Sequence, residues 1–277
     1  MEFRDRYDRL HDDLRVSVTD RCNLRCSYCM PEEPVWFPRN QILDYEEMHR
    51  LVRIMASHGV RKVRVTGGEP LVRKDLGRFI RLLAGTEGVE DISLTTNGVL
   101  LEDMAGELAG AGLQRVNVSL DTLDPDTFRR LTRRDDLHRV LAGLDAAAAA
   151  GLTPLKINAV LLRGVNESEA EWFVETARSK GWEVRFIEFM PLENSGTWDL
   201  AQVVTGKEVQ GRIHRRWPMD PDPAGDPSAP ATRFLFRDGQ GSVGFINSIT
   251  EPFCGDCSRL RLTADGKFRV CLYDERE

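Results

Sequence analysis

The stretch LRVSVTDRCNLRCSYC, residues 14–29, places three cysteines directly after a β-rich run. Leu14–Val18 alternates apolar and polar residues, which predicts a strand, and Cys22, Cys26 and Cys29 follow it with the spacing C-x3-C-x2-C. Three thiolates on one short loop can wrap one face of a [4Fe–4S] cluster, whereas a fully ligated cluster usually takes four cysteines. One iron is then open to a small chelating molecule. The alternative is a zinc site, which normally needs a fourth cysteine or histidine nearby.

Further along the chain, short β-rich runs alternate with helical patterns. Asp44 and Glu47 are spaced as a capping box at the start of a helix, and Gly59 lies just past its end. Strands are expected at residues 62–66, 92–96, 115–120, 155–161 and 183–189, and helical patterns at 44–58, 76–83, 102–109, 136–150 and 167–180. Alternation of this kind predicts an α/β fold, an incomplete (partial) TIM barrel of about six strand–helix units.

The pattern changes after residue 217. Residues 218–230 are rich in Pro, Asp, Gly and Ala, which predicts a loop or linker. Beyond it, residues 232–236 and 242–249 are expected to pair as antiparallel strands on either side of Asp238-Gly239. We therefore expect two domains, a partial barrel over residues 1–217 and a C-terminal antiparallel extension over residues 218–277.

Composition limits the function classes. The 277 residues carry a formal net charge of −6, which indicates neither nucleic acid nor a membrane surface as a partner. No apolar run is long enough to span a membrane, and the first thirteen residues lack the apolar segment of a signal peptide. We therefore expect a cytoplasmic protein, in which six cysteines are better explained as metal ligands than as disulfides.

Polar residues follow several predicted strands at their carboxyl ends. TGGEP at residues 66–70 follows the second strand, TTNG at residues 95–98 ends the third, and Ser119 and Asp121 end the fourth. A barrel enzyme carries its active site on this face. Any one of these segments could equally be a turn or a structural cap.

The three remaining cysteines form a second triplet. Cys254, Cys257 and Cys271 have the spacing C-x2-C-x13-C, which fits a second cluster with an open iron, zinc being the alternative. Between them, alternation in SRLRL predicts a strand with Arg259 and Arg261 on one face. Two guanidinium groups beside an open iron suit an anion or a nucleobase, and an ordinary solvated strand face is the alternative.

These motifs resemble a known family. The C-x3-C-x2-C loop, with Tyr28 just before its last cysteine, is similar to that of the radical S-adenosylmethionine superfamily. LRVSVTDRCNLRC at residues 14–26, RVTGGEP at residues 64–70 and CGDCSRLRL at residues 254–262 together resemble the GTP 3′,8-cyclase family over essentially the whole chain. Two alternatives stay open: another radical S-adenosylmethionine enzyme with an auxiliary cluster, such as a peptide-modifying one, and a catalytically impaired iron–sulfur homologue.

The resemblance implies a reaction. S-adenosylmethionine chelates the open iron of the first [4Fe–4S] cluster, and one electron from that cluster yields a 5′-deoxyadenosyl radical. The radical removes the ribose 3′ hydrogen of GTP, and the carbon radical attacks position 8 of the guanine. The product is (8S)-3′,8-cyclo-7,8-dihydroguanosine 5′-triphosphate, the first intermediate of molybdenum cofactor biosynthesis. A low-potential, flavodoxin-like electron donor and a homodimer are also implied.

The resemblance also assigns residues. The two [4Fe–4S] clusters are expected at Cys22, Cys26 and Cys29 and at Cys254, Cys257 and Cys271. Contacts to S-adenosylmethionine are expected from Tyr28, Gly67, Gly68, Glu69, Ser119 and Met190. Contacts to GTP are expected from Arg15, Arg64, Thr95, Lys156, Arg259 and Arg261. The catalytic residues are expected to be Cys22, Cys26, Cys29, Arg259 and Arg261.

The family pattern continues past the third distal cysteine to a segment that ends in two glycines, whereas this sequence ends at Glu277. We expect the 277-residue chain to fold and to bind both ligands. We also expect it to couple cleavage of S-adenosylmethionine poorly to cyclisation.

Overall fold

The computed structural model describes residues 2–192 and 198–273. One sheet holds eleven strands in these residues, in the order β11-β10-β1-β2-β3-β4-β5-β6-β9-β8-β7. Six consecutive parallel strands form its centre: β1 (Asp13–Ser17), β2 (Lys62–Thr66), β3 (Asp91–Thr96), β4 (Arg115–Ser119), β5 (Lys156–Leu161) and β6 (Glu183–Glu188). The predicted α/β partial barrel is confirmed.

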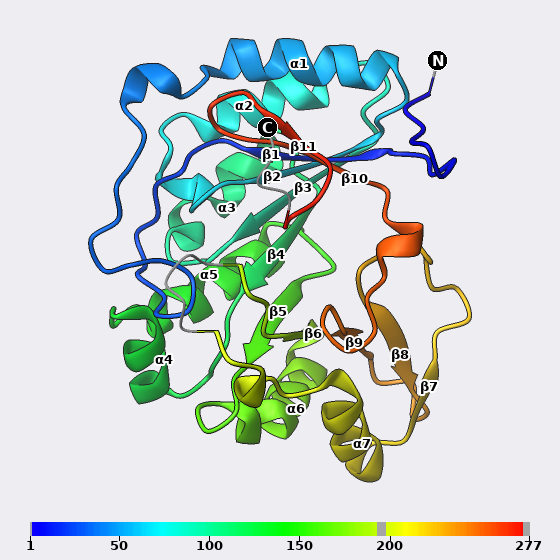
Figure 1. Ribbon diagram of the computed structural model, residues 1–277. Coiled ribbons are helices and arrows are strands. Elements are labelled where there is room, and N and C mark those ends of the chain that lie inside the picture. Colours follow the sequence, from blue (N-terminus) through cyan, green and yellow to red (C-terminus); the bar gives the residue numbers. More distant parts are fainter. Residues whose placement is uncertain (1, 193–197, 274–277) are drawn as a thin grey trace.

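Helices follow the strands and cover the outer face of the curved sheet, as Figure 1 shows. They are α1 (Tyr45–Ser57), α2 (Leu76–Ala84), α3 (Leu101–Gly110), α4 (Pro125–Thr132), α5 (Leu137–Ala149), α6 (Ala170–Lys180) and α7 (Gly206–Arg216). The capping box predicted for α1 is present, because the side chains of Asp44 and Glu47 each accept a hydrogen bond from the other's backbone N–H, both at 2.8 Å. In the part of the chain that the structure describes, no helix combines the length and the apolar character needed to cross a membrane.

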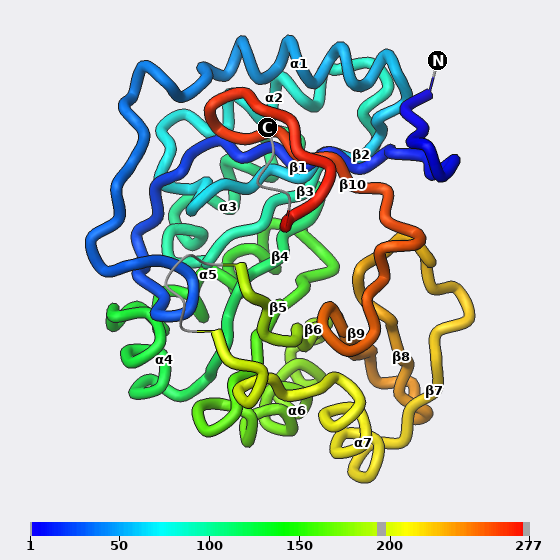
Figure 2. Tube along the Cα trace, in the orientation of Figure 1, coloured from blue at the N-terminus to red at the C-terminus, as the bar shows by residue number. Residues whose placement is uncertain are grey.

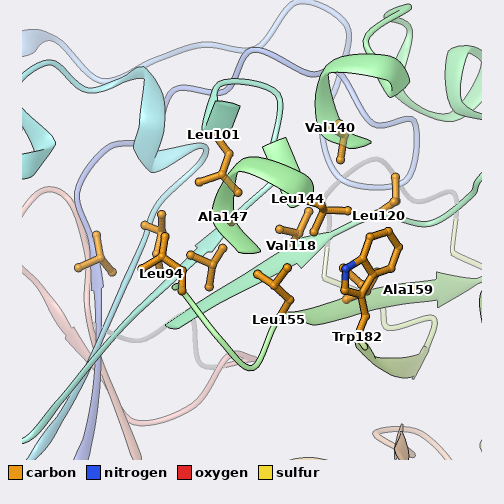
Figure 3. Close-up of a cluster of buried hydrophobic side chains, with 14 of the residues drawn as sticks. Leu94, Leu101, Val118, Leu120, Val140, Leu144, Ala147, Leu155, Ala159 and Trp182 are labelled. Carbon is orange, nitrogen blue, oxygen red and sulfur yellow. The ribbon is translucent and has the colours of Figure 1, made fainter. Parts of the chain in front are cut away.

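The core lies between the sheet and these outer helices. Figure 3 shows Leu101 of α3 and Leu144 and Ala147 of α5 close to Val118 of β4, and all four side chains are fully buried. Because one face of each strand packs against helices in this way, the opposite face of the sheet is free to form the inside of the barrel.

The C-terminal region lies at both edges of the central sheet. β9 (Ser242–Ile246) runs parallel to β6 and pairs with β8 (Thr232–Phe236), which pairs with β7 (Met219–Pro221). β10 (Arg259–Leu262) runs parallel to β1 on the other side, and pairs with β11 (Phe268–Arg269). The connection over residues 247–258 therefore crosses from one edge of the sheet to the other, and Figure 2 shows this crossing in orange.

The sequence predicted the antiparallel β8–β9 pair and the strand at β10, but not their places at opposite edges. It also did not predict α4, α7, β7 or β11. The sheet is continuous across the predicted boundary between residues 217 and 218, and that division into two domains stays a prediction.

Candidate active site

The inner face of the barrel carries a row of arginines. Side chains alternate along a strand, so the buried Leu14 and Val16 of β1 pack outward and Arg15 lies on the opposite face. Arg15 is directly opposite Arg64 of β2 on one side and Arg261 of β10 on the other. Like charges opposite one another on neighbouring strands destabilise a sheet, so this row needs a compensating anion.

A cavity of about 200 Å³ lies against this row. It is lined by five of the six residues that were predicted to contact GTP, namely Arg15, Arg64, Thr95, Arg259 and Arg261. It is also lined by Cys254, Cys257, Cys271 and Met190. The structure thus brings the whole distal cysteine triplet and most of the predicted substrate residues to one space.

Two arginines of this cavity, Arg15 and Arg64, each have a buried donor without a partner in the described residues. The Nε atoms of Arg15 and Arg64 are buried and have no hydrogen-bond partner among residues 2–192 and 198–273. Burial, together with the neighbouring charges of Arg64 and Arg261, lowers the pKa of Arg15 to about 9. Buried donors without partners are costly, so the cavity is prepared for a ligand that brings several negative charges.

Lys156 lies apart from this set. It lines an adjoining pocket of about 290 Å³, where the strands begin, and Arg64 and Arg185 line both pockets. Burial, together with the charge of Arg185, lowers the pKa of Lys156 to about 8. The adjoining pocket is mixed in charge, because Asp13, Asp91, Glu183, Asp222 and Asp226 also line it.

Arg185 is a cavity residue that the sequence did not predict. Its Nε donates to Glu183 at 2.8 Å, and its side chain lies in both pockets. The available signal was its position in β6, two residues after Glu183, on the face that does not pack against the core.

The distal cysteine loop is held by the arginine that follows it. The Nη2 and Nε atoms of Arg259 donate to Sγ of Cys257 at 3.1 and 3.3 Å, and the guanidinium lies 4.8 Å from the centre of the Phe253 ring. Burial raises the pKa of Cys257, but the backbone and the charge of Arg259 outweigh it, and the pKa is lowered overall. A thiol that ionises easily is suited to metal ligation.

The proximal cysteine loop lies at the carboxyl ends of the strands. Backbone N–H groups of Arg25 and Ser27 donate to the carbonyls of Thr132 and Leu131 at the end of α4, at 3.0 and 2.8 Å. Burial raises the pKa of Cys26, and Asp121, Cys29 and Cys22 add to it in that order. The three thiols are therefore close enough to influence one another.

The donor sets fit iron–sulfur clusters. Each triplet consists of thiols alone, none of the six is joined in a disulfide, and the distal three face one cavity. In the described ranges, no three His, Cys, Asp or Glu side chains are grouped closely enough to hold one metal ion. The thiols would be held farther apart around a four-iron cube than around a single ion.

The glycines after β2 bring two loops into contact. A Cβ atom at Gly68 would lie 2.4 Å from the carbonyl oxygens of both Asp20 and Arg21, and one at Gly67 would lie 2.6 Å from that of Thr19. Only glycine allows this approach, so TGGEP is packed directly on the start of the cysteine loop.

Glu69 points to the end of β3. Its carboxylate, only 1% exposed, accepts hydrogen bonds from Thr96 Oγ1 at 2.6 Å, from Asn97 N at 2.6 Å and from Leu71 N at 3.0 Å. Burial raises its pKa to about 7. Asn97 Nδ2 in turn lies 3.8 Å from Sγ of Cys22, so the Glu69 side chain reaches the first cysteine through Asn97.

Tyr28 is anchored by a residue outside the predicted set. Its hydroxyl donates to the carboxylate of Asp121, whose other oxygen accepts from Val160 N at 2.9 Å. Burial raises the pKa of Asp121 to about 6. Ser119 ends β4 two residues before Asp121 and is exposed, so both lie on the same face as the cysteine loop.

Parallel strands with a three-cysteine loop at their carboxyl ends define the chain as a radical S-adenosylmethionine protein, and the Radical SAM superfamily model matches residues 16–177. A second model, Molybdenum Cofactor Synthesis C, matches residues 182–277. Superfamily membership implies a [4Fe–4S] cluster and S-adenosylmethionine as cofactors.

Similarity to curated proteins shows which family within the radical S-adenosylmethionine superfamily the chain belongs to. GTP 3′,8-cyclase of Rhodopirellula baltica is 50% identical over 279 residues, which cover 99% of this chain and 77% of that protein. GTP 3′,8-cyclase of Moorella thermoacetica is 47% identical over 276 residues, covering 99% and 85%. The chain therefore belongs to the GTP 3′,8-cyclase family, as the motifs predicted.

Solved structures agree on the fold. SuiB of Streptococcus suis, solved bound to its precursor peptide SuiA, superposes with a TM-score of 0.68 at 16% identity, covering 96% of this chain and 61% of SuiB. At this identity the likeness concerns the fold alone.

Proposed function

We propose that this enzyme cyclises GTP to (8S)-3′,8-cyclo-7,8-dihydroguanosine 5′-triphosphate, the first step of molybdenum cofactor biosynthesis. The GTP 3′,8-cyclase relatives support this activity, because they match nearly the whole chain. The single observation that carries it is the cavity in which three cysteines meet a row of arginines, two of which have a buried Nε atom without a hydrogen-bond partner in the described residues.

Two clusters complete the proposed site. Cys22, Cys26 and Cys29 would hold the first, and Cys254, Cys257 and Cys271 the second, each with one iron that has no protein ligand. When bound, the first cluster and S-adenosylmethionine supply the 5′-deoxyadenosyl radical that abstracts the ribose 3′ hydrogen. S-adenosylmethionine would be bound by Tyr28, Gly67, Gly68, Ser119 and Met190, with Glu69 acting through Asn97.

The chain's own residues would orient the nucleotide. Arg259 and Arg261 lie beside the distal cysteines and would hold the nucleotide at the second cluster. Arg15, Arg64 and Arg185 continue the cationic surface, and Lys156 extends it into the adjoining pocket. Polyphosphate oxygens would then provide the partners that the two buried Nε atoms lack.

The remaining cavity wall would keep the reaction dry. Ile187, Ile246, Phe253 and Met190 place apolar side chains beside the arginines. Exclusion of water strengthens the charge pairs and protects a radical from side reactions. A peptide substrate is the second candidate, but a peptide would match the row Arg261, Arg15 and Arg64 only with several acidic side chains, whereas a triphosphate brings its negative charges on one group.

The family resemblance supports three further proposals. They are a low-potential, flavodoxin-like electron donor, a homodimer and a cytoplasmic location. The division at residues 217 and 218, with the second cluster in the C-terminal domain, is proposed on the change of sequence pattern there.

The activity is tested by anaerobic turnover. Reconstituted chain is supplied with S-adenosylmethionine, a low-potential reductant and either GTP or ATP, and products are measured by mass spectrometry. We expect 5′-deoxyadenosine together with a cyclised guanosine triphosphate from GTP alone. Cys26→Ser is the matched inactive control. Formation of 5′-deoxyadenosine with no cyclised nucleotide under any condition would contradict the proposal.

A further inference from the structure

The first residues of the chain form a hairpin beside the distal cysteine loop. Arg4 and Leu10 pair as an antiparallel bridge, and His11 N donates to the Phe3 carbonyl at 2.9 Å. The turn is made at Asp8, whose φ of 61° lies in the left-handed region. We call residues 3–11 the N-terminal hairpin. Figure 2 shows its dark blue trace on the same side of the molecule as the orange turn at residues 254–256.

The hairpin holds one arginine in a fixed direction. The Asp5 carboxylate lies 2.7 Å from Nε and 2.5 Å from Nη2 of Arg9, and it also accepts the backbone N–H of Arg9 at 3.1 Å. His11 Nε2 lies 3.3 Å from the same carboxylate. Two nitrogens of the guanidinium are thus fixed by Asp5, and Nη1 points away from the hairpin.

That remaining nitrogen reaches the distal loop. Nη1 of Arg9 donates to the backbone carbonyl of Cys254, across 245 residues of chain. The same carbonyl is the acceptor for Cys257 N at 3.4 Å, which closes the short turn between the two cysteines. The guanidinium also interacts electrostatically with Cys257. Arg9 thus contacts the turn that sets the spacing of two thiols, from outside the nucleotide cavity, which it does not line.

We propose that Arg9 is a positioning residue for the second cluster: it holds the Cys254–Cys257 turn in its ligating shape and places a positive charge beside the cluster. This inference rests on the proposed second cluster. Hydrogen bonds and charges around the cysteine ligands set how easily a cluster is reduced and how well it is held. A fixed positive charge favours the more negative, reduced state.

A purely structural role of the hairpin is the competing explanation, and variants separate the two. Arg9→Gln removes the charge, and Arg9→Lys keeps the charge but loses the forked geometry. Asp5→Asn keeps the charge of Arg9 but releases two of its guanidinium nitrogens, so it separates the orientation of Arg9 from its charge. Arg4→Gln is the matched control, because Arg4 lies in the same hairpin and bonds to Asp8 and Glu2.

The measured quantity is the midpoint potential of the second cluster, with the first cluster removed. In a Cys26→Ser background, the midpoint potential of the remaining cluster is measured by an anaerobic redox titration followed by electron paramagnetic resonance. Iron per chain and the unfolding temperature are measured in the same variants. We expect Arg9→Gln to lower the equilibrium constant for reduction about tenfold, which is about 59 mV for one electron. Arg9→Lys should recover most of this shift, and Arg4→Gln should show none.

The outcomes distinguish a failure of the role assigned to Arg9 from a failure of the proposed second cluster. An unchanged potential and iron content in Arg9→Gln would overturn the inference. So would an equal shift in Arg4→Gln, because hairpin integrity would then explain it. If the Cys26→Ser chain holds no iron–sulfur cluster while the unsubstituted chain holds one, the proposed second cluster itself fails, and the inference about Arg9 falls with it.

Discussion

Replacing Arg64 by methionine should stabilise the free protein and weaken GTP binding. Arg64 lies on the inner face of β2, where it is directly opposite Arg15. Its Nε is buried without a hydrogen-bond partner in the described part of the chain. Burial lowers its pKa, with Asp13 and Asp91 opposing the shift and Arg185 and Arg115 adding to it. A residue selected for the stability of the free chain would not be placed in this way.

The size of both effects follows from this environment. A buried charged donor without a partner costs about 1–3 kcal/mol, and methionine fills a similar volume without that cost. At roughly 2–4 °C per kcal/mol for a chain of this size, the unfolding temperature of the ligand-free protein should rise by about 2–12 °C. Removing a desolvated partner of the triphosphate should cost about 2–5 kcal/mol of binding, or roughly thirtyfold to several thousandfold in affinity.

The assay pairs a thermal unfolding scan of the reconstituted, nucleotide-free chain with anaerobic calorimetry of GTP binding. Arg61→Met is the control, since Arg61 is exposed and pairs with Glu90 at the surface, so both values should barely change. The opposite outcome is that Arg64→Met lowers the unfolding temperature as well as the affinity. Arg64 would then be a structural counter-ion for Asp13 and Asp91.

Three other predictions test the remaining parts of the site. Cys26→Ser should remove about half of the iron and abolish cleavage of S-adenosylmethionine, measured as iron per chain and as 5′-deoxyadenosine formed. Full retention of iron would contradict the assignment of Cys26 as a ligand of the first cluster. Arg259→Ala and Arg261→Ala should each weaken GTP binding by about 2–5 kcal/mol, measured by calorimetry, and leave the affinity for S-adenosylmethionine nearly unchanged. An equal loss of affinity for both ligands would argue against separate sites. GTP affinity should fall as pH rises above about 8, because Lys156 loses its charge there and a triphosphate prefers it charged. Lys156→Arg should reduce the fall near pH 8 and leave the part that Arg15, with a pKa of about 9, contributes at higher pH; a curve identical to that of the unsubstituted chain would exclude Lys156 as a source.

The central fold could be predicted because its signals are local. Each strand from β1 to β6 is a short β-rich run, and α1 carries a complete capping box. α4 was missed although Asp124 caps it by accepting Thr127 N at 2.8 Å, since eight residues show too little periodicity. α7 was missed for a related reason: its buried large side chains are few, Val209 and Ile213, so its apolar stripe is weak.

The chemistry of the site could be predicted where residues are close in sequence. Spacing alone identified the two cysteine triplets, and alternation placed Arg259 and Arg261 beside the second. The depth of each residue in the barrel could not be predicted, because it depends on the register between strands. Lys156 and Arg185 illustrate this: Lys156 lies in the adjoining pocket where the strands begin, whereas Arg185, which no sequence motif indicated, reaches both pockets.

The pairing of β10 with β1 explains why the substrate cavity needs the whole chain. Arg15 is near the start of the sequence and Arg261 near its end, and they become neighbours only when these two strands align. The alignment places like charges opposite one another, so electrostatics opposes it in the free protein. Buried Leu14 and Leu262, both fully inaccessible, supply apolar contact that favours it. A triphosphate between the arginines would turn the repulsion into attraction, so binding and the joining of the two ends of the chain favour each other.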